Sequence, residues 1–351
     1  MVYKILVLNA GPFGSTMGGA LRLSSLFLGR KGVELIWAGP EGAASTENAT
    51  VLPPLKKSSH RLTEWWRREE YYLKAARENE CDAAIFCNAW GTRRARALLK
   101  KKGVTVAFDY SDLMHAFHSG LAKLVARKET VRALKDASLT IVTAQALAED
   151  AGQYNKRVEL VANGVDLEFY SKARARRLEH PNAGFVGALG AWIDGEALAA
   201  ASHGLPDNKF YLVGEGPASA WLKSAADKNT VFAGRVSHEE ARDYAAGFDV
   251  ALVPFKKNDL TDAVCPIKLF EYWALGKPVV SSHLREVKRI ADDAVAYATT
   301  PKEWSDVVGE VLADENLARE LAEKGKRLVK NYDWRKLGGD YLTALERAGE
   351  K

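Results

Sequence analysis

The sequence predicts an α/β protein made of two units in which parallel strands alternate with helices. Three observations support this prediction. The chain has 351 residues, which is long for a single core and suits two domains. Short aliphatic runs alternate with helical segments along both halves, as two Rossmann-like domains require. A buried strand followed by a small-residue loop and a helix occurs twice, after Val2–Leu8 and after Ala183–Val186.

Composition places the chain among ordinary soluble proteins, with 47% apolar and 27% charged residues. No run reaches the apolar length of a membrane span, and the N-terminus is predicted to be a strand rather than a signal peptide. The three cysteines match no zinc motif and indicate a reducing compartment. A net charge of +5 permits an anionic ligand or membrane surface. We therefore expect a cytoplasmic protein without a nucleic-acid partner.

The first half of the chain is expected to form one strand–helix unit. Its strands are expected at Val2–Leu8, Val33–Trp37, Ala83–Cys87, Val104–Phe108, Leu139–Val142 and Val158–Val161. Its helices are expected from Ala20 and over Arg61–Asn79, Thr92–Lys102, Gly120–Asp136 and Ala144–Ala151. Residues 45–59, which contain two adjacent prolines, are expected to form a loop.

The glycine-rich loop Gly11–Gly19 joins the first strand to the first helix. Such loops let backbone approach a ligand closely, although the dinucleotide fingerprint G-x-G-x-x-G is absent here. Glycines that only turn the chain explain the local sequence equally well. Gly18 and Gly19 are therefore candidate ligand contacts, and the alternative is that they only turn the chain.

Acidic side chains and a histidine follow the strand Val104–Phe108. Asp109, Asp112 and His115 lie beyond its carboxyl end, which is where open parallel sheets bind ligands. Each could act as a base, because a titratable group in a cleft beside carboxylates suits proton transfer. Both aspartates could instead cap the next helix, and His115 could be structural.

Two features of the first half suggest contact surfaces. The tryptophans Trp65 and Trp66 are predicted to pack in the core on one side of their helix. The alternative is that they contact the interfacial layer of a membrane. Arg93, Arg96 and Lys100 are predicted to share one solvated helix face. A docking patch for anionic lipid or a polyanionic acceptor is the alternative for these three residues.

The second half is expected to form a similar unit after a charged linker that ends in a proline. Its strands are expected at Ala183–Val186, Lys209–Val213, Val231–Phe232, Asp249–Pro254 and from Pro278. Its helices are expected from Gly195 and Pro266 and over His238–Gly247, Arg285–Ile290, Pro301–Ala313, Glu315–Lys330 and Trp334–Arg347. The loop Lys256–Val264 is expected to be polar and mobile.

The stretch Cys265–Ser282 carries the strongest functional signal. Pro266 suits the first turn of a helix, because its missing N–H would be unpaired there. Lys268 lies in that turn, where free amides and the helix dipole favour an anion. Glu271, three residues on, shares its face. A nucleoside diphosphate could use the cation, the helix start and the carboxylate together; a plain surface pair of Lys268 and Glu271 is the alternative.

Cys265–Ser282 resembles the donor-site motif of GT-B glycosyltransferases in the "glycosyl transferases group 1", family-four-like lineage. The resemblance implies that Glu271 holds the ribose of a nucleotide sugar, with Ile267 and Lys268 at its phosphates or sugar. The glutamate that usually precedes it would fall at Ala263. The form here resembles a divergent branch in which Lys268 takes over phosphate or sugar contacts.

Further segments resemble the same family. They are Asn163-Gly-Val-Asp166, the opening Gly187–Asp194, Gly234-Arg-Val236 and Tyr332-Asp-Trp334. The resemblance implies that Gly187 admits the donor phosphates, that Arg235 binds phosphate and that the backbone of Val236 contacts the base. It also places Asn163, Gly18 and Gly19 near the donor. An Arg/Lys pair that many members carry is missing, so Arg235 and Lys268 are expected to neutralise the diphosphate.

The resemblance implies a GT-B fold, α/β with two Rossmann-like domains facing across a cleft. We expect an acceptor domain over residues 1–166, a linker over 167–181, a donor domain over 182–331 and a last helix, 332–351, crossing back to the first domain. The implied reaction transfers a sugar from a nucleotide diphosphate sugar to an acceptor hydroxyl. No metal or cofactor is expected, because the chain has no Asp-x-Asp motif.

Some alternatives remain open within this expectation. Retention of anomeric configuration is the family's rule, whereas an inverting relative would use Asp109, Asp112 or His115 as base. Polysaccharide, glycolipid or glycan assembly is implied, with a carbohydrate or lipid-linked acceptor and peripheral contact at the inner membrane face. Rival interpretations are a non-catalytic nucleotide-sugar-binding subunit, suggested by Ala263, and a sugar-nucleotide epimerase of the same fold, against which Trp192 and Asp194 argue.

Overall fold

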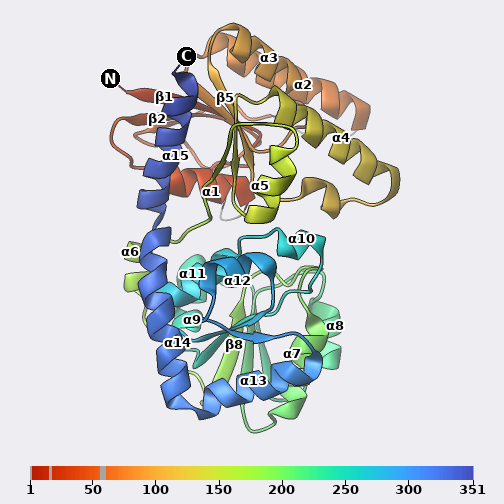
Figure 1. Ribbon diagram of the computed structural model, residues 1–351, viewed down its shortest axis with the longest axis vertical. Coiled ribbons are helices and arrows are strands. Elements are labelled where there is room, and N and C mark those ends of the chain that lie inside the picture. Colours follow the sequence, from red (N-terminus) through yellow and green to blue (C-terminus); the bar gives the residue numbers. More distant parts are fainter. Residues whose placement is uncertain (1, 16–17, 56–60, 351) are drawn as a thin grey trace. The chain divides into compact units, whose positions relative to one another are not determined.

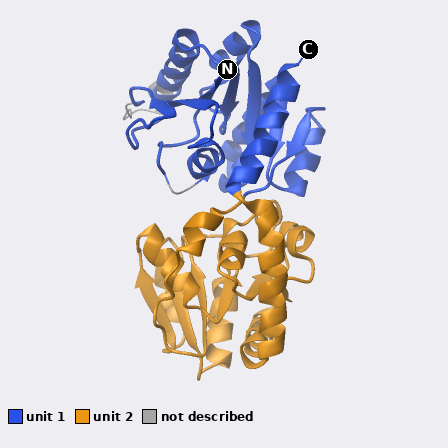
Figure 2. Ribbon diagram, turned by 90° about the vertical axis from the view of Figure 1, so that its left-hand side faces the viewer, with its two compact units in different colours: residues 1–163, 334–351 blue, residues 164–333 orange. Residues whose placement is uncertain are grey.

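The computed structural model describes residues 2–15, 18–55 and 61–350 (Figure 1). It divides into two compact units, which are residues 1–163 with 334–351, and residues 164–333 (Figure 2). Each unit contains one parallel sheet with helices around it. The predicted α/β class is therefore confirmed.

The first unit is built on a seven-stranded parallel sheet in the order β3-β2-β1-β4-β5-β6-β7. Its strands are β1 (Tyr3–Leu8), β2 (Val33–Ala38), β3 (Ala49–Val51), β4 (Ala83–Phe86), β5 (Thr105–Tyr110), β6 (Leu139–Val142) and β7 (Val158–Leu160). The central strands are continuous apolar runs that are buried on both faces, as parallel sheets covered by helices require.

Helices cover both faces of this sheet. They are α1 (Gly18–Phe27), α2 (Arg61–Glu78), α3 (Arg93–Lys101), α4 (Gly120–Asp136), α5 (Gln145–Gly152) and α15 (Trp334–Gly349), with the 3-10 helix η1 (Met114–Phe117). The last helix packs on the first, with the rings of Phe27 and Tyr341 edge to face at 5.2 Å. Gly338 permits this approach, because a Cβ there would collide with the Leu26 carbonyl oxygen.

The second unit is built on a six-stranded parallel sheet in the order β10-β9-β8-β11-β12-β13. Its strands are β8 (Asn182–Val186), β9 (Lys209–Val213), β10 (Thr230–Gly234), β11 (Val250–Val253), β12 (Val279–Ser282) and β13 (Ala296–Ala298). Its helices are α6 (Leu167–Ser171), α7 (Gly195–Gly204), α8 (Ser219–Ala225), α9 (His238–Ala246), α10 (Asp259–Asp262), α11 (Ile267–Ala274), α12 (Arg285–Ala291), α13 (Pro301–Ala313), α14 (Glu315–Leu328) and the 3-10 helix η2 (Val329–Tyr332).

Helix α11, which carries the predicted donor motif, is fixed by its apolar face. Phe270, Tyr272 and Trp273 are fully buried, and Phe270 stacks on Tyr332 with ring centroids 4.4 Å apart. Pro266 is the N-cap residue rather than a first-turn residue, with ψ of 115°. The helix ends at its C-cap Leu275, and Gly276 follows with φ of +66°, a conformation that glycine adopts without strain.

Several elements differ from the prediction. Strand β3 lies inside the expected loop 45–59, and β13 lies between the helices expected at Arg285–Ile290 and Pro301–Ala313, where no strand was expected. Both are three-residue edge strands, and their pairing depends on neighbours distant in sequence rather than on a local pattern. Residues 167–181 contain helix α6 and belong to the second compact unit. The loop Lys256–Val264 contains α10, whose N-cap Asn258 forms a capping box with Thr261.

Candidate functional site

In the second unit, glycines lie at the carboxyl ends of β8, β9 and β10. The Gly187 amide donates to the Val213 carbonyl at 2.9 Å, and the Gly214 amide donates to the Gly234 carbonyl at 2.8 Å. Gly187 and Gly214 have φ of +155° and +134°. A Cβ on Gly214 would collide with the Gly187 carbonyl oxygen. Glycine is therefore required where these two loops touch.

The start of α11 lies beside Gly187. A Cβ built on Gly187 would lie 3.5 Å from Cε of Lys268, so the lysine stem runs along this glycine. The Lys268 ammonium donates to Glu271 Oε2 at 2.6 Å. Ile267 is the first residue of the helix, and its N-cap Pro266 provides no side-chain cap. The structure thus brings Gly187, Ile267, Lys268 and Glu271 together at one free helix N-terminus.

Glu271 is largely buried, at 8% exposure. On one side it meets Tyr170 of α6, and burial followed by the Glu271 carboxylate raises the pKa of the Tyr170 hydroxyl. The neighbouring Tyr272 hydroxyl accepts a hydrogen bond from the Val186 amide at 2.9 Å. These two tyrosines hold the helix on the end of β8 and keep the carboxylate in place. Sequence reasoning missed Tyr170, which lies in the expected linker.

Arg235 and Val236 follow the edge strand β10, two strands away from β8. Arg235 is exposed, and among the residues that the structure describes it makes no hydrogen bond or ion pair. Val236 is half-buried. The structure therefore leaves the Arg235 guanidinium available at the same edge of the sheet without joining it to Lys268.

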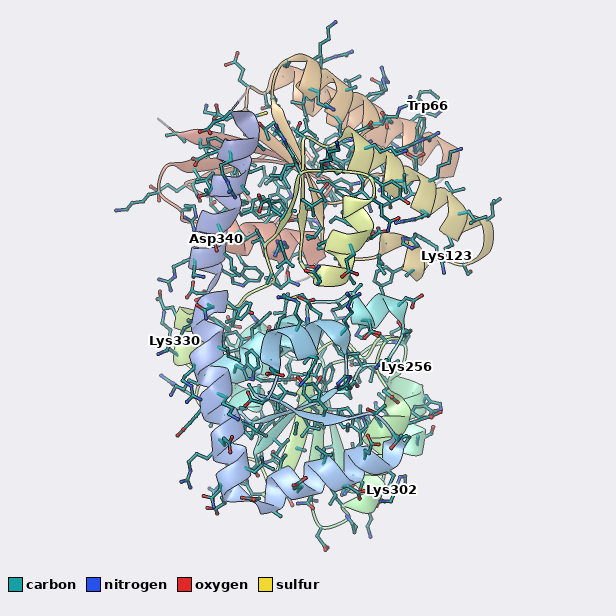
Figure 3. All side chains as sticks on the ribbon, in the orientation of Figure 1. Trp66, Lys123, Lys256, Lys302, Lys330 and Asp340 are labelled. Atoms are coloured by element: carbon teal, nitrogen blue, oxygen red, sulfur yellow. The ribbon has the colours of Figure 1, made fainter. Side chains whose placement is uncertain are left out.

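A pocket of about 630 Å³ opens between the loops after β8, β9 and β11. Its lining includes Gly190, Asp194, Glu196, Trp221, Lys256 and Lys257. The loop around Lys256 (Figure 3) is tied down, because the Lys256 amide donates to the Trp192 carbonyl at 2.8 Å. This pocket shares no lining residue with the predicted donor set.

In the first unit, Asp109 belongs to a buried ion-pair cluster. The Asp109 side chain is fully buried, and its Oδ2 lies 3.1 Å from Nε of Arg22, which is also buried. Arg22 donates further to the Ala162 and Val161 carbonyls at 2.8 and 2.7 Å, and to Oδ1 of Asn163 at 3.2 Å. Asp109 and Asn163 therefore lie together around Arg22, in positions that suit anchoring better than proton transfer. Nothing in the sequence pattern had pointed to Arg22.

Asp112 lies in a different environment from Asp109. It is half-buried, and burial, opposed by a 3.5 Å hydrogen bond from Ser111, raises its pKa to about 6. The following 3-10 helix has Leu113 as its N-cap residue, so Asp112 does not occupy the capping position considered for it. A carboxyl that titrates near neutral pH suits acid–base chemistry.

His115 lies on η1, and burial followed by the Arg127 cation lowers its pKa. Its Nδ1 is buried and has no hydrogen-bond partner among the residues that the structure describes. Arg127 itself pairs with Asp150 at 2.5 Å. His115 is therefore neutral at neutral pH and retains one nitrogen for a further hydrogen bond.

The predicted glycines of the first unit differ in their surroundings. Gly18 begins α1 with φ of +60° and open space around it. A Cβ on Gly19 would lie 2.9 Å from Sγ of Cys87 and 3.4 Å from the Ala10 carbonyl, so Gly19 lets α1 pack closely on the sheet. In the described ranges, no group of three or more His, Cys, Asp or Glu side chains has the arrangement of a metal site.

Comparison with known proteins finds similar sequences and structures. Residues 180–331 match the family model described as "Glycosyl transferases group 1". Over 253 residues the chain is 25% identical to TuaH of Bacillus subtilis, a glycosyltransferase named for teichuronic acid biosynthesis, covering 65% of this chain and 64% of that protein. The match to the group 1 glycosyl transferases thus covers most of the second unit. The chain is also 24% identical over 252 residues to a phosphatidyl-myo-inositol mannosyltransferase of Propionibacterium freudenreichii, covering 67% and 64% of the two chains.

Solved structures show the same fold over the whole chain. Sucrose-phosphate synthase of Thermosynechococcus elongatus superposes with a TM-score of 0.80 at 16% identity, covering 99% of both chains. Anabaena HepE in complex with UDP and glucose gives a TM-score of 0.75 at 16% identity, covering 98% and 99%. WaaG, a glycosyltransferase of lipopolysaccharide biosynthesis, gives 0.70 at 15% identity, covering 97% and 99%. The chain therefore has the predicted GT-B fold.

The curated relatives are longer than the matched part. The two alignments span about 64% of the length of each relative. Among the described residues, none of the helices has the length and apolar character needed to cross a bilayer.

Replacing Asp109 by Asn tests whether the buried Arg22 pair is structural. Removing one partner leaves the other charge buried and uncompensated, which costs about 3 kcal/mol or more of unfolding free energy. Urea unfolding of Asp109→Asn measures this loss. Asp136→Asn is the matched control, because Asp136 pairs with buried Arg96 but is itself 48% exposed. Unchanged stability in Asp109→Asn would refute the anchoring role.

The raised pKa of Asp112 predicts a pH-dependent effect of Asp112→Asn. Between the ordinary pKa of 3.8 and the folded value of about 6, the unfolded carboxyl binds fewer protons than the folded one, so the wild-type protein loses stability as pH rises. The variant lacks this loss. We expect Asp112→Asn to gain stability relative to wild type between pH 4 and pH 7 in chemical denaturation. A difference that does not vary with pH would contradict the assigned environment.

Proposed function

We propose that the protein transfers a sugar from a nucleoside diphosphate sugar to an acceptor hydroxyl. The observation that carries the proposal is the juxtaposition of Gly187, the free start of α11 and the Lys268–Glu271 pair. The glycine lets the backbone approach a phosphate closely, and the helix amides and the ammonium can bind that phosphate. The carboxylate can accept hydrogen bonds from hydroxyl groups. HepE, a solved structure of the same fold, is described in complex with UDP and glucose, and supports this class of donor.

The donor is proposed to lie along the carboxyl edge of the second unit's sheet. The Glu271 carboxylate would accept hydrogen bonds from the ribose hydroxyls. The Lys268 ammonium, the first amides of α11 and the backbone at Gly187 would hold the diphosphate. Arg235 would add a second cation, and the Val236 backbone would contact the base. Because these donors are already in position, they would stabilise the charge that develops on the leaving diphosphate.

Diphosphate binding would compete with Glu271 for the Lys268 ammonium. The ammonium nitrogen and the carboxylate oxygen are 2.6 Å apart, and a diphosphate is a stronger partner for the ammonium because it carries more charge. Lys268 would turn toward the phosphates, which frees Glu271 oxygens for the ribose. The same two residues would thus bind both parts of the nucleotide.

The first unit is proposed to hold the acceptor. Asp112 and His115 are the proposed polar contacts of the acceptor hydroxyl, because one titrates near neutral pH and the other has an unpartnered ring nitrogen. Asp109 and Asn163 are proposed to support this loop through Arg22. In a retaining reaction the donor phosphate takes the acceptor proton. In an inverting one Asp112 is the proposed base.

The acceptor class is proposed from the relatives. TuaH is named for teichuronic acid biosynthesis and the second relative for phosphatidyl-myo-inositol. A polysaccharide or a lipid-linked glycan is therefore the proposed acceptor, and peripheral attachment at the inner membrane face is the proposed location.

One competing function has an observation in its favour. Ala263 is buried where the family's first glutamate would lie, so part of the usual sugar contact is absent. A subunit that binds the nucleotide sugar without transferring it would tolerate this loss. Donor binding without hydrolysis or transfer would identify such a subunit.

Ligand-induced stabilisation tests the donor site. With a UDP, GDP, ADP or TDP sugar at a hundred times its dissociation constant, the matching donor should stabilise the native protein by about 2.7 kcal/mol. Glu271→Gln should remove most of that stabilisation, because the amide cannot replace the ribose-binding carboxylate. Glu196→Gln, on the separate pocket, is the matched control. Equal stabilisation in all three proteins would place the nucleotide elsewhere.

Turnover of Asp112→Asn distinguishes the two stereochemical courses. A retaining enzyme should keep its rate within about tenfold, whereas loss of a general base lowers the rate by roughly 10²–10⁴-fold. Transfer by Asp112→Asn and by Asp109→Asn is measured with the donor found above. The anomeric configuration of the product, read by NMR, gives an independent answer. A retained configuration together with a base-like loss in Asp112→Asn would contradict the assigned roles.

A further inference from the structure

The junction of η1 and α4 exposes an unusual group of apolar side chains. Phe117, Leu121, Leu124 and Val125 are 49%, 76%, 67% and 40% exposed. Two of the four are among the most exposed large apolar side chains described in the protein. We call these four residues the α4 ridge. Scattered apolar residues on a surface are common, but a contiguous group indicates a contact surface.

The α4 ridge follows from the helical spacing. Leu121, Leu124 and Val125 are three and four residues apart, so they lie on one face of α4. The buried residues of the same helix are Ala126, Thr130, Ala133 and Leu134, which lie on the opposite face. All residues from 117 to 125 are exposed. The first turns of α4 therefore extend beyond the packed part of the first unit (Figure 1).

The charges around the α4 ridge have one sign. Residues 117–128 contain no Asp or Glu and include Lys123, Lys128 and Arg127, of which Arg127 is paired with Asp150. Lys123 and Lys128 are exposed, and Figure 3 shows Lys123 at this end of α4. The next acidic residue, Glu129, is already paired with Arg132 at 2.5 Å. Protruding apolar side chains between unneutralised lysines match the chemistry of an anionic bilayer surface.

The two surfaces considered from the sequence fit a membrane less well. Trp66 of α2 is 58% exposed and so is not in the core. The same helix carries two glutamates, however. Glu64 pairs with Arg68, and Glu70 pairs with Arg94. Arg96 does not lie on a solvated basic face, because it is buried against Asp136. Three arginines of these helices, Arg68, Arg94 and Arg96, are thus paired with carboxylates.

A protein partner also fits less well than a bilayer. A stable protein interface needs about 800 Å² and roughly 20–30 residues on each side, whereas the α4 ridge is a narrow projection of four side chains. Insertion into a bilayer needs no complementary surface, because each apolar side chain gains free energy by leaving water. We propose that the α4 ridge inserts into the interfacial layer of an anionic membrane, with Lys123 and Lys128 at the lipid phosphates. This proposal does not depend on the donor or acceptor.

Vesicle co-sedimentation of the full chain tests the proposal. The probe is vesicles of phosphatidylcholine with about one-third phosphatidylglycerol. Leu121→Gln with Leu124→Gln should weaken binding by roughly tenfold or more, because two inserted side chains become polar. Lys123→Gln with Lys128→Gln should weaken it by about fivefold for each lysine, and high salt should reproduce that loss.

The matched control is Leu28→Gln with Leu160→Gln. These leucines are exposed in the same unit, at 37% each, outside the α4 ridge, and their replacement should leave vesicle binding unchanged. Because all four leucines are exposed, each double variant should keep the wild-type melting temperature, which the same samples report. Donor-induced stabilisation measured on the variants separates this question from the proposed reaction.

Three results would overturn the proposal. One is equal vesicle binding by wild type and Leu121→Gln with Leu124→Gln. Another is equal binding to pure phosphatidylcholine vesicles, which would remove the role of the lysines. The third is a wild-type dimer in size-exclusion chromatography that the α4 ridge variant converts to a monomer, with no vesicle binding by either. Such a dimer would assign the α4 ridge to a second copy of the chain.

Discussion

The position of α11 is the constraint on which the candidate site depends. Lys268 and Glu271 can act on one ligand only if their helix starts directly beside the loop after β8. Stacking of Phe270 on Tyr332 at 4.4 Å fixes one side of the helix. The Tyr272 hydroxyl ties the other side to the Val186 amide, one residue before Gly187. A site made of a few polar groups is thus oriented by an apolar helix face, and a small shift of that face would separate the cation from the glycine loop.

The first unit uses a different device. Arg22 on α1 donates hydrogen bonds to Asp109 of β5, to the Ala162 carbonyl and to the side chain of Asn163, and these groups form one buried cluster. A fully buried pair is tolerated because every arm of the guanidinium finds an oxygen. The pair fixes the end of β5 and therefore the start of the loop that presents Asp112 and His115. Asp109 and Asp112 look equivalent in sequence but lie in different environments. Asp109 is buried and paired with Arg22, whereas Asp112 is half-buried and has a raised pKa.

Much of this arrangement was predictable from local patterns. The buried strands of both sheets are continuous apolar runs, and α13 begins with a capping box of Thr300 and Glu303 and with Pro301, so these elements could be predicted from the sequence. Strands β3 and β13 did not, because three-residue edge strands are defined by their partners. The association of Gly187 with Lys268 was anticipated through a family resemblance rather than from spacing. Arg22 and Tyr170 could not be anticipated, because their partners lie far away in the chain and nothing local marks them. The exposure of the α4 ridge could not be anticipated either, because an apolar helix face is ordinarily a core face.

The central claim is that a nucleoside diphosphate binds at the start of α11, and a structure determined with UDP tests it most directly. The account predicts that the diphosphate lies within hydrogen-bonding distance of the Lys268 ammonium and the first amides of α11, with the ribose on Glu271 and the Lys268–Glu271 pair opened. UDP bound instead in the pocket beside Trp221 and Lys256, with that pair intact, would contradict it.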